Sequence, residues 1–435
     1  MRRGLISATD PVNRPALATG APAVDLYRTT PVEVERAHLT SIRGGAHVVR
    51  VVRSVEEVES LRADWVSLVG DCVHTDPDYF LWSLREEPHV LRPHILAIER
   101  EGRVEGIVVA RIADAPLPCK LGHSTVYAPT VRALCVLREG WLGRADAYTA
   151  EVVLDELLAA LDRREADVVL FRQLEQGSVL HRAALARSTF ATRRQHAART
   201  DVRWQIELQP TLEEYLASVS SSTRKGVRRT ASRLERELGD RLSVRVFSDT
   251  PDLDVFLDDI EAVAGRTYQR RLGVGYVGDD RQRTRLKLLA AHGWLRGYVL
   301  YLDGQPIAFE LGELYGGRFH SVAGAYDPDH AHERVGAYLL LEAIEELGSR
   351  HVSLLDFGFG DAEYKGKLAH RRSEEGDLVI YARRVRPIWI KFVRTALLEI
   401  SVAVTTGLAR LALLERIKHW SRRSGGVGES AGPTA

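Results

Sequence analysis

The chain has 435 residues, more than one hydrophobic core normally organises, so we expect two domains and tails. The 60 basic and 59 acidic residues leave a net charge of +1, which gives no global reason to expect a nucleic-acid or anionic-membrane partner. The three cysteines form no CxxC pair and no disulfide framework, which indicates a reducing cytoplasm.

The first 200 residues predict a lead segment followed by alternating strands and helices. Residues 1–46 have the composition of a disordered lead, and no apolar run follows Met1 as it would in a signal peptide. Two short apolar strands joined by the turn Glu101-Gly102 lie within 94–112. The remaining predictions are a helix over 55–69 with Ser54 as its N-cap, a helix over 148–164 and a buried strand over 167–171.

A basic helix follows in the middle of the chain. Thr211 to Glu214 forms a capping box for a short helix, and a longer helix follows Ser220 to Thr223 and ends at Gly239. This longer helix is either a solvated charged face or a cradle for an anionic ligand such as donor phosphates, an acyl carrier or a tRNA acceptor stem. Its cationic residues are Arg224, Lys225, Arg228, Arg229, Arg233 and Arg236.

Residues 296–365 carry the strongest signal. Strands over 298–302, 306–314 and 318–326 are separated by Asp303-Gly304 and Gly316-Gly317 turns, and Val335 starts an amphipathic helix that Gly348 is placed to end. A strand over 352–357 follows. Helix N-termini bind phosphates through unpaired N–H groups, and a small residue such as Gly336 allows close backbone approach. The alternative is a plain amphipathic helix behind a loop.

This order of elements resembles the GNAT acyltransferase fold. The run Asp356-Phe357-Gly358-x-Gly360-Asp361-x-x-Tyr364-Lys365 is similar to the closing motif of the CelD-type and FemAB-like group of bacterial, envelope- or exopolysaccharide-associated acyltransferases. Two more stretches resemble that group, one over 220–229 and one at Trp65-Val66-x-Leu68. The resemblance covers about 48–384. The helix opening departs from the usual pattern because Gly336 is the one glycine left there.

The resemblance implies an α/β (α+β) fold with two tandem GNAT-like domains, mixed mostly antiparallel sheets flanked by helices, and a C-terminal helical tail. The turn between the strands of 94–112 echoes Asp303-Gly304, which we interpret as a weak internal repeat, although any two strands joined by a tight turn look alike. The predicted boundaries are a lead over 1–46, a domain over 47–200 without a donor site, a catalytic domain over 201–386, an amphipathic segment over 387–424 and a disordered tail over 425–435.

The resemblance also implies roles for individual residues. Tyr364 would be the general acid that protonates the leaving thiolate, because a phenol keeps its proton at neutral pH; otherwise it is a packing aromatic. Lys365 would hold a phosphate or an anionic group of the acceptor. Asp361 would orient Tyr364 or Lys365, or would cap the helix that follows. The donor, acyl-CoA (acetyl-CoA), would bind Arg334, Val335, Gly336 and Ala337 at the helix start and the strand backbone at Val322, Ala323 and Gly324.

Several other residues are candidate bases or acceptor contacts. Asp356 ends a strand and is a candidate base or acceptor ligand, while His320 lies inside a strand, where histidine is more often structural. Glu310, on the opposite strand, is another candidate base and acceptor contact. We expect Arg224 and Lys225 to line a cleft, and the other four cations of the basic helix to lie at the surface. No carboxylate, histidine or cysteine spacing suits a metal, so none is predicted.

The C-terminal segment 387–420 is apolar but too interrupted by charge to span a bilayer. Its tryptophans and flanking cations suit an interfacial helix, and the alternative is a helix packed on the protein or on a second subunit. We therefore expect a cytoplasmic protein, with peripheral contact at the inner membrane face as the further hypothesis.

Three functions follow from these patterns. The first is acyl transfer from acyl-CoA to an amine or hydroxyl of a small molecule, glycan or lipid. The second keeps the fold and uses aminoacyl-tRNA as donor, as in FemAB relatives. The third is a binding protein with a basic helix that has lost the chemistry.

Overall fold

The computed structural model describes residues 47–121, 124–189, 200–267, 270, 275–360 and 362–410. Their contacts separate two units. The N-terminal unit is Arg43–Leu68, Leu81–Thr200 and Glu375–Ala435, and the C-terminal unit is Met1–Ile42, Val69–Phe80 and Asp201–Glu374. The predicted lead 1–46 and tail 425–435 lie outside the described residues.

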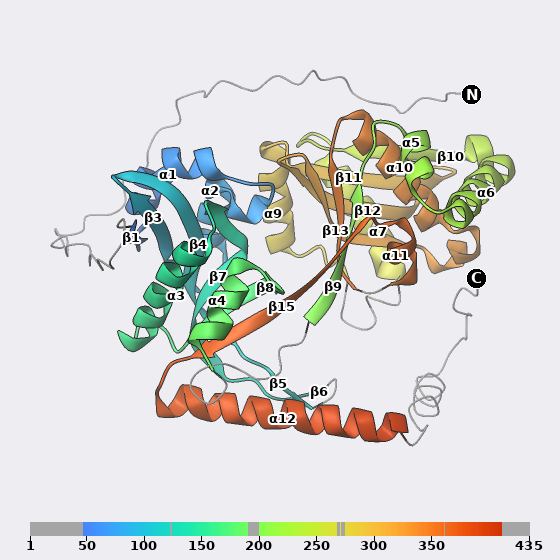
Figure 1. The fold of residues 1–435 in the computed structure, drawn as a ribbon. Helices are drawn as coiled ribbons and strands as arrows, with labels where there is room; N and C mark the ends of the chain where they lie inside the picture. Colours follow the sequence, from blue (N-terminus) through green and yellow to red (C-terminus); the bar gives the residue numbers. More distant parts are fainter. Residues whose placement is uncertain are drawn as a thin grey trace. The chain divides into compact units, whose positions relative to one another are not determined.

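The N-terminal unit is built on one sheet in the order β1-β3-β4-β7-β8-β15, with β2 paired to β4 (Figure 1). Pairing is antiparallel except between β7 and β8, which run parallel. A separate hairpin joins β5 and β6. The strands are β1 His47–Val52, β2 Val90–Pro93, β3 Ile95–Arg100, β4 Arg103–Pro116, β5 Cys119–Leu121, β6 Ser124–Tyr127, β7 Thr130–Gly143, β8 Val168–Glu175 and β15 Arg371–Tyr381.

Helices cover this sheet. The predicted helix over 55–69 is α1 (Val55–Leu68), and the one over 148–164 is α3 (Ala147–Asp162), which begins at a capping box between Asp146 and Thr149. α3 and α4 (Val179–Arg187) bury their apolar faces against β3, β4, β7 and β8. α12 (Val385–Arg410) packs against β5. α2 (Pro77–Glu86) crosses the boundary between the units in sequence.

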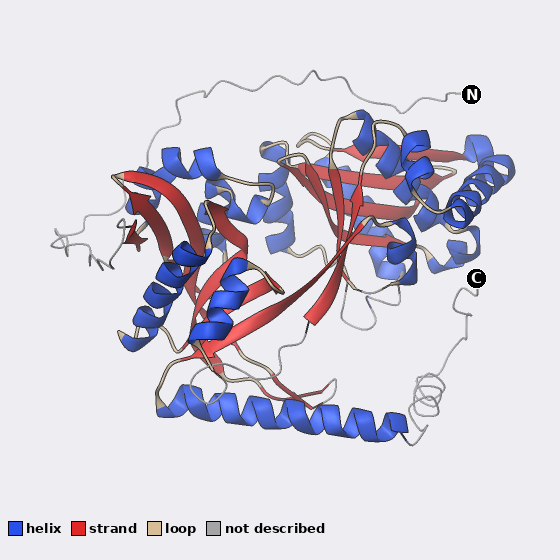
Figure 2. Cartoon of the chain, in the orientation of Figure 1, coloured by secondary structure: helices blue, strands red, loops and turns tan. Residues whose placement is uncertain are grey.

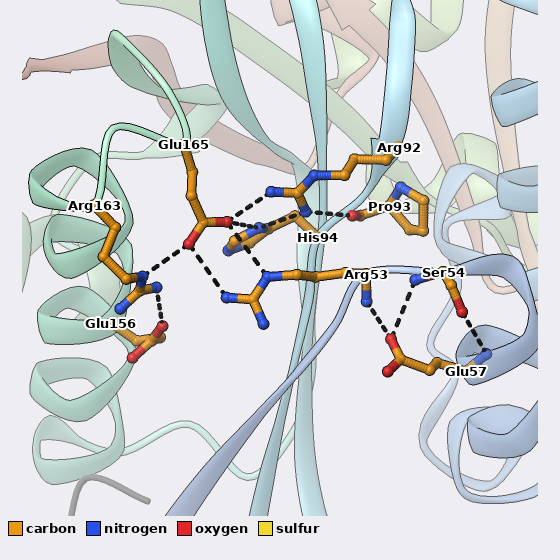
Figure 3. Close-up of polar contacts among 9 residues, drawn as sticks. All are labelled: Arg53, Ser54, Glu57, Arg92, Pro93, His94, Glu156, Arg163 and Glu165. Atoms are coloured by element: carbon orange, nitrogen blue, oxygen red, sulfur yellow. Dashed lines mark hydrogen bonds and ion pairs between the residues drawn. The ribbon is translucent and has the colours of Figure 1, made fainter. Parts of the chain in front are cut away.

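A cluster of charged side chains around Glu165 joins the end of β1, strand β2 and the segment between α3 and β8 (Figure 3). The Glu165 carboxylate accepts hydrogen bonds from Arg92 at 2.6 Å, Arg163 at 2.8 Å and Arg53 at 3.2 Å. Burial alone would raise the pKa of Glu165, but these guanidinium groups outweigh it and lower the pKa to about 2. His94 is fully buried beside them, and burial lowers its pKa to about 3, so it is neutral.

The C-terminal unit repeats the plan with the sheet order β10-β11-β12-β13-β14-β9. β13 and β14 run parallel, and the other pairs are antiparallel. The predicted strand over 318–326 matches β13, and the two before it are extended by a few residues. The strands are β9 Thr200–Glu207, β10 Leu242–Phe247, β11 Leu295–Leu302, β12 Gln305–Tyr315, β13 Arg318–Tyr326 and β14 Leu354–Phe359.

Helices lie on both faces of this sheet (Figure 2). On one face α10 is anchored by its buried Glu346, which accepts hydrogen bonds from Arg296 and, at 2.8 Å, from the Tyr298 hydroxyl. On the other face Phe256 of α7 occupies the space beside Gly297. The helices are α5 Leu212–Ser218, α6 Ser221–Leu238, α7 Leu253–Arg266, α9 Asp280–Ala291, α10 Val335–Ser349 and α11 Glu363–Leu368, with short 3-10 turns at Val73–Thr75, Gly239–Arg241 and Pro328–Glu333.

Two predictions are corrected by this fold. Gly348 does not end α10, which continues through Ser349; a Cβ at 348 would lie 2.2 Å from the Gln209 carbonyl oxygen, so the glycine permits close packing. Residues 375–386, predicted as part of the second domain, belong to the N-terminal unit because β15 from Glu375 to Tyr381 pairs with β8. The last strand of the N-terminal order, β15, thus comes from far along the chain, whereas the last strand of the C-terminal order, β9, directly precedes the other five. The internal repeat is visible as the matching strand orders.

Candidate active site

The candidate site lies where β13 and β14 stop pairing with each other. They pair only through Arg318–His320 and Leu354–Asp356, after which β13 continues along β12. β14, which pairs with β9 from Leu354 to Asp356, bends at Gly358, whose φ of +64° is readily adopted by glycine, and pairs with β9 again at Phe359. The β12–β13 register also slips at Val322, which is the extra residue of a β-bulge. An open edge of β13 therefore begins beyond His320, where backbone N–H groups can meet a ligand.

His320 is oriented at the start of this edge by a buried ion pair. Its Nδ1 lies 3.1 Å from Oδ2 of Asp356, which is fully buried. Arg203 of β9 donates from Nε to both carboxylate oxygens at 3.0 and 2.9 Å, and the Gly358 N–H donates to Oδ1 at 2.9 Å. With these donors around it, Asp356 suits a positioning role better than that of a base. Because an ionised carboxylate can only accept, Nδ1 is the nitrogen that donates to Asp356, and Nε2 is left to face the strand edge.

Glu310 of β12 is a second proton acceptor on the neighbouring strand. Its carboxylate accepts a hydrogen bond from the Ser321 hydroxyl. Burial raises the pKa of Glu310 to about 7, although Ser321 and Lys365 act in the opposite direction. Gly324 is its partner across β12 and β13, and a Cβ there would lie 2.2 Å from Glu310 Oε2. The glycine at 324 therefore makes room for the carboxylate.

Tyr364 and Lys365 come to the same place from α11. The Tyr364 side chain packs edge-on against Phe357 with ring centroids 6.1 Å apart, yet 53% of the residue is exposed. Burial of the hydroxyl and the nearby Glu310 carboxylate raise the pKa of Tyr364 to about 12, so it is protonated at neutral pH. Lys365 Nζ donates to the carbonyl oxygens of Phe357 at 3.1 Å and Phe359 at 2.9 Å. Lys365 thus holds the bent end of β14.

The start of α10 lies beside the end of β13. A Cβ at Gly336 would be 3.1 Å from the ring of Tyr326, so the missing side chain makes room for this tyrosine as well as for any ligand. Arg334 is the N-cap residue, in the left-handed conformation with φ 59°, and its side chain forms no capping hydrogen bond. The Ala337 N–H donates to the Arg334 carbonyl at 3.0 Å, so the N–H groups of Val335 and Gly336 are those left for an anion. Val335 is buried, whereas Arg334 and Ala337 are exposed.

The basic helix α6 is tied to its own unit. Arg224 donates to the Leu216 carbonyl at 3.3 Å, which joins α6 to α5, while Lys225 is exposed. Arg233, predicted at the surface, donates to the His332 carbonyl at 3.0 Å in the turn that leads into α10. The structure thus gives Arg224 a structural contact and brings Arg233 near the helix start.

The predicted site residues therefore gather in two groups that share β13. His320, Asp356, Glu310, Tyr364 and Lys365 surround the divergence of the strands, and Arg334 to Ala337 lie near Tyr326 at its far end. Asp361 lies outside the described residues. Among the described residues, no group of three or more metal-ligating side chains is found.

Sequence reasoning missed Arg203 and Ser321. Arg203 lies 153 residues from Asp356 in the chain, and nothing in its surroundings marks it as the counter-ion of a buried carboxylate. Ser321 follows His320 directly, so only the bulge and register of β13 bring it to Glu310.

Comparison with known proteins supports the GNAT assignment of this unit. Residues 221–366 match the family described as acetyltransferase (GNAT) domain. The resemblance drawn from the sequence is confirmed for these residues. No curated protein matches the chain.

Solved structures share the fold at low identity. FemX superposes with a TM-score of 0.54 at 12% identity, covering 78% of this chain and 98% of that one. A tandem GNAT protein from the clavulanic acid biosynthesis pathway gives 0.45 at 13% identity, covering 78% and 99%. A protein from Bacteroides thetaiotaomicron gives 0.49 at 12% identity, covering 80% and 100%. The likeness to FemX supports the FemAB-like version of the fold.

Proposed function

We propose that the C-terminal unit transfers an acyl group from an acyl-CoA thioester to an amine or hydroxyl acceptor. The observation that carries this proposal is the parting of β13 from β14 in a GNAT-type domain. Near the open edge of β13 lie a proton acceptor, Glu310 on β12, and a proton donor, Tyr364 on α11, and the Glu310 carboxylate is near enough to raise the pKa of Tyr364. The helix start at Val335 lies beside the other end of the same strand.

The donor would be held by its phosphates and its thioester. Phosphates suit the start of α10, where unpaired N–H groups and the helix dipole favour negative charge. The thioester carbonyl would lie along β13 near the Val322 bulge, where backbone N–H groups can stabilise the oxyanion of the tetrahedral intermediate. We favour acyl-CoA over aminoacyl-tRNA because Arg224 and Arg233, two cations of the helix that a tRNA would meet, already bind carbonyl groups of their own unit.

The chemistry requires two proton transfers. Glu310 removes a proton from the acceptor nitrogen or oxygen as that atom attacks the thioester carbon. The carbon–sulfur bond then breaks, and Tyr364 gives its proton to the leaving thiolate. Glu310 can hand its proton back to the tyrosinate, which restores both groups. His320, oriented by Asp356, would contact the acceptor from the strand edge.

A thiol-release assay tests the proposal directly. The full-length protein would be incubated with acetyl-CoA or longer acyl-CoA donors and a panel of amines and amino sugars, and free thiol would be measured with a chromogenic disulfide. We expect release that depends on both the protein and an acceptor. Donor protection from heat unfolding without thiol release for any acceptor would indicate a binding protein. Low-salt tRNA binding that weakens steeply with salt would favour the aminoacyl-tRNA donor.

A further inference from the structure

Helix α12 of the N-terminal unit has one buried face and an exposed apolar stripe opposite it. The buried face, which includes Ile390, Lys391 and Thr395, packs in its own unit. The exposed stripe presents Val385, Trp389, Phe392 and Ile400, each between 49 and 89% exposed. Their spacing of four, three and eight residues places them on one side of the helix, with exposed Ala396 and Ala403 between and after them. An exposed apolar stripe that includes Trp389 and Phe392 indicates an interaction surface.

The hairpin β5–β6 adds to this surface. β5 packs along α12, as Figure 1 shows at the foot of the unit. Its exposed apolar residues are Leu121 on β5 and Val126 and Tyr127 on β6. We call these residues, together with the exposed stripe of α12, the α12 surface. Exposed apolar side chains gathered on neighbouring elements mark interaction sites. Trp389 and Tyr127 are residue types that favour the boundary between an apolar and a wet phase.

Cations outnumber acidic residues near the α12 surface. Lys391 is buried, Arg384 and Arg386 pair with Asp167 at 3.0 and 3.6 Å, and Glu399 is exposed beside Ile400. Between Asp377 and Glu399 the chain carries Arg383, Arg384, Arg386, Lys391 and Arg394 and no acidic residue. The hairpin segment 115–130 carries Lys120 and no acidic residue. Elsewhere acidic and basic residues are nearly balanced, because the net charge of the whole chain is only +1. Arg383, Arg386 and Lys120 are exposed.

We propose that the α12 surface docks on a membrane containing anionic lipids. An interfacial helix buries its apolar face at the level of the headgroups while cations beside it meet the negative surface. A second copy of the chain is the other occupant, and the test below distinguishes it from a membrane. No helix among the described residues is long and apolar enough to cross a membrane, so the contact is peripheral. This inference is independent of the acyl transfer proposed above.

Vesicle co-sedimentation of the full-length protein tests the inference. We expect it to pellet with vesicles of mixed phosphatidylglycerol and phosphatidylcholine and much less with phosphatidylcholine alone. The bound fraction should fall when NaCl rises from about 0.05 M to about 0.5 M, because salt screens the attraction. Trp389→Glu with Phe392→Glu should weaken partitioning at least about tenfold. Val66→Glu, a change at an exposed valine on α1 of the same unit, should leave it unchanged.

The results of this experiment distinguish an anionic membrane from a second copy of the chain as the partner of the α12 surface. Equal pelleting of wild-type and doubly substituted protein, or none by either, overturns the proposal. So does sedimentation without vesicles that shows a dimer which the double substitution dissociates. Equal, salt-insensitive binding to both kinds of vesicle removes the role of anionic lipid. Trp389→Ala is a milder second variant, and its melting temperature should match that of wild type, since the side chain is mostly exposed. Thiol release with a soluble acceptor should be the same in all variants.

Discussion

The pH dependence of acyl transfer offers the sharpest test of Glu310 as the base. Burial raises the pKa of Glu310 to about 7, so roughly a tenth of the enzyme carries the ionised carboxylate at pH 6 and about nine-tenths at pH 8. We expect kcat/KM to rise about tenfold per pH unit below 7 and to level off above 8. No falling limb should appear in this range, because the pKa of Tyr364 is about 12.

Glu310→Gln keeps the shape of the side chain and removes the base. We expect its thiol-release rate to fall by about 10²- to 10⁴-fold and its pH profile to become flat below pH 8. The acceptor should have an amine pKa below about 6, so that its own ionisation adds no limb. Glu342→Gln serves as a control, because Glu342 is a carboxyl with a pKa raised by burial that lies on α10. A limb near pH 7 that persists in Glu310→Gln would assign the base elsewhere, with His320 the first candidate.

Glu310→Gln should lower activity but raise the stability of the folded protein. The folded state holds the Glu310 proton up to about pH 7, whereas the unfolded chain releases it near 4.5, so ionisation destabilises the fold as pH rises between these values. Glu310→Gln removes this penalty and should stabilise the protein by about 1–3 kcal/mol at pH 8 but not at pH 4. Urea unfolding at both values measures it. A variant that is inactive and also less stable at pH 8 would contradict the reasoning.

Three further predictions concern the acid, the donor and the N-terminal unit. Tyr364→Phe should lower kcat for acetyl-CoA by about 10²-fold or more with little change in donor affinity, measured by thiol release and by calorimetric titration; unchanged kcat would reject Tyr364 as the acid. Arg334→Gly should relieve left-handed backbone strain, which raises the free energy of unfolding by about 1 kcal/mol, and yet should weaken acyl-CoA binding. His351, at φ 60° just beyond the C-terminal end of α10, provides the control, because His351→Gly should raise stability without changing acyl-CoA binding. Glu165→Gln should lower the free energy of unfolding by about 3 kcal/mol at pH 7. This difference should shrink as the pH falls from 4.5 towards 2, because a carboxyl with a lowered pKa in the folded state stabilises the fold only while it is ionised. If urea unfolding showed a difference that does not change with pH, the ion pairs of Glu165 would not be the source of the stability.

Local rules were enough to predict the core of the C-terminal unit. Asp303-Gly304 and Gly316-Gly317 adopt positive φ and mark the hairpins, so the strands between them were found from the sequence. The capping box at Thr211 and Glu214 is present with both of its hydrogen bonds. In each case the signal and its partner lie within a few residues, so no tertiary information is needed.

Long-range pairing could not be read in the same way. Arg203 and Asp356 meet because β9 is placed beside β14, and the pairing of β15 with β8 joins residues about two hundred positions apart. The close packing at two glycines was not predicted either, and Gly348 was misread as a helix end. Gly324 makes room for Glu310 and Gly348 for the Gln209 carbonyl, and both reasons depend on neighbours that only the folded chain brings close.

The two repeats bear on the role that we propose for the polar cluster around His320 and Asp356. In the N-terminal unit, every residue of the parallel ladder between β7 and β8 (133–136 and 168–171) belongs to a hydrophobic cluster. In the C-terminal unit the equivalent ladder ends on His320 and Asp356, and Arg203 must be buried to balance the charge. Apolar residues stabilise this junction without the cost of removing charges from water, as the first repeat demonstrates. A buried ion pair kept at the one point where the sheet opens is therefore better explained by chemistry at that opening than by stability.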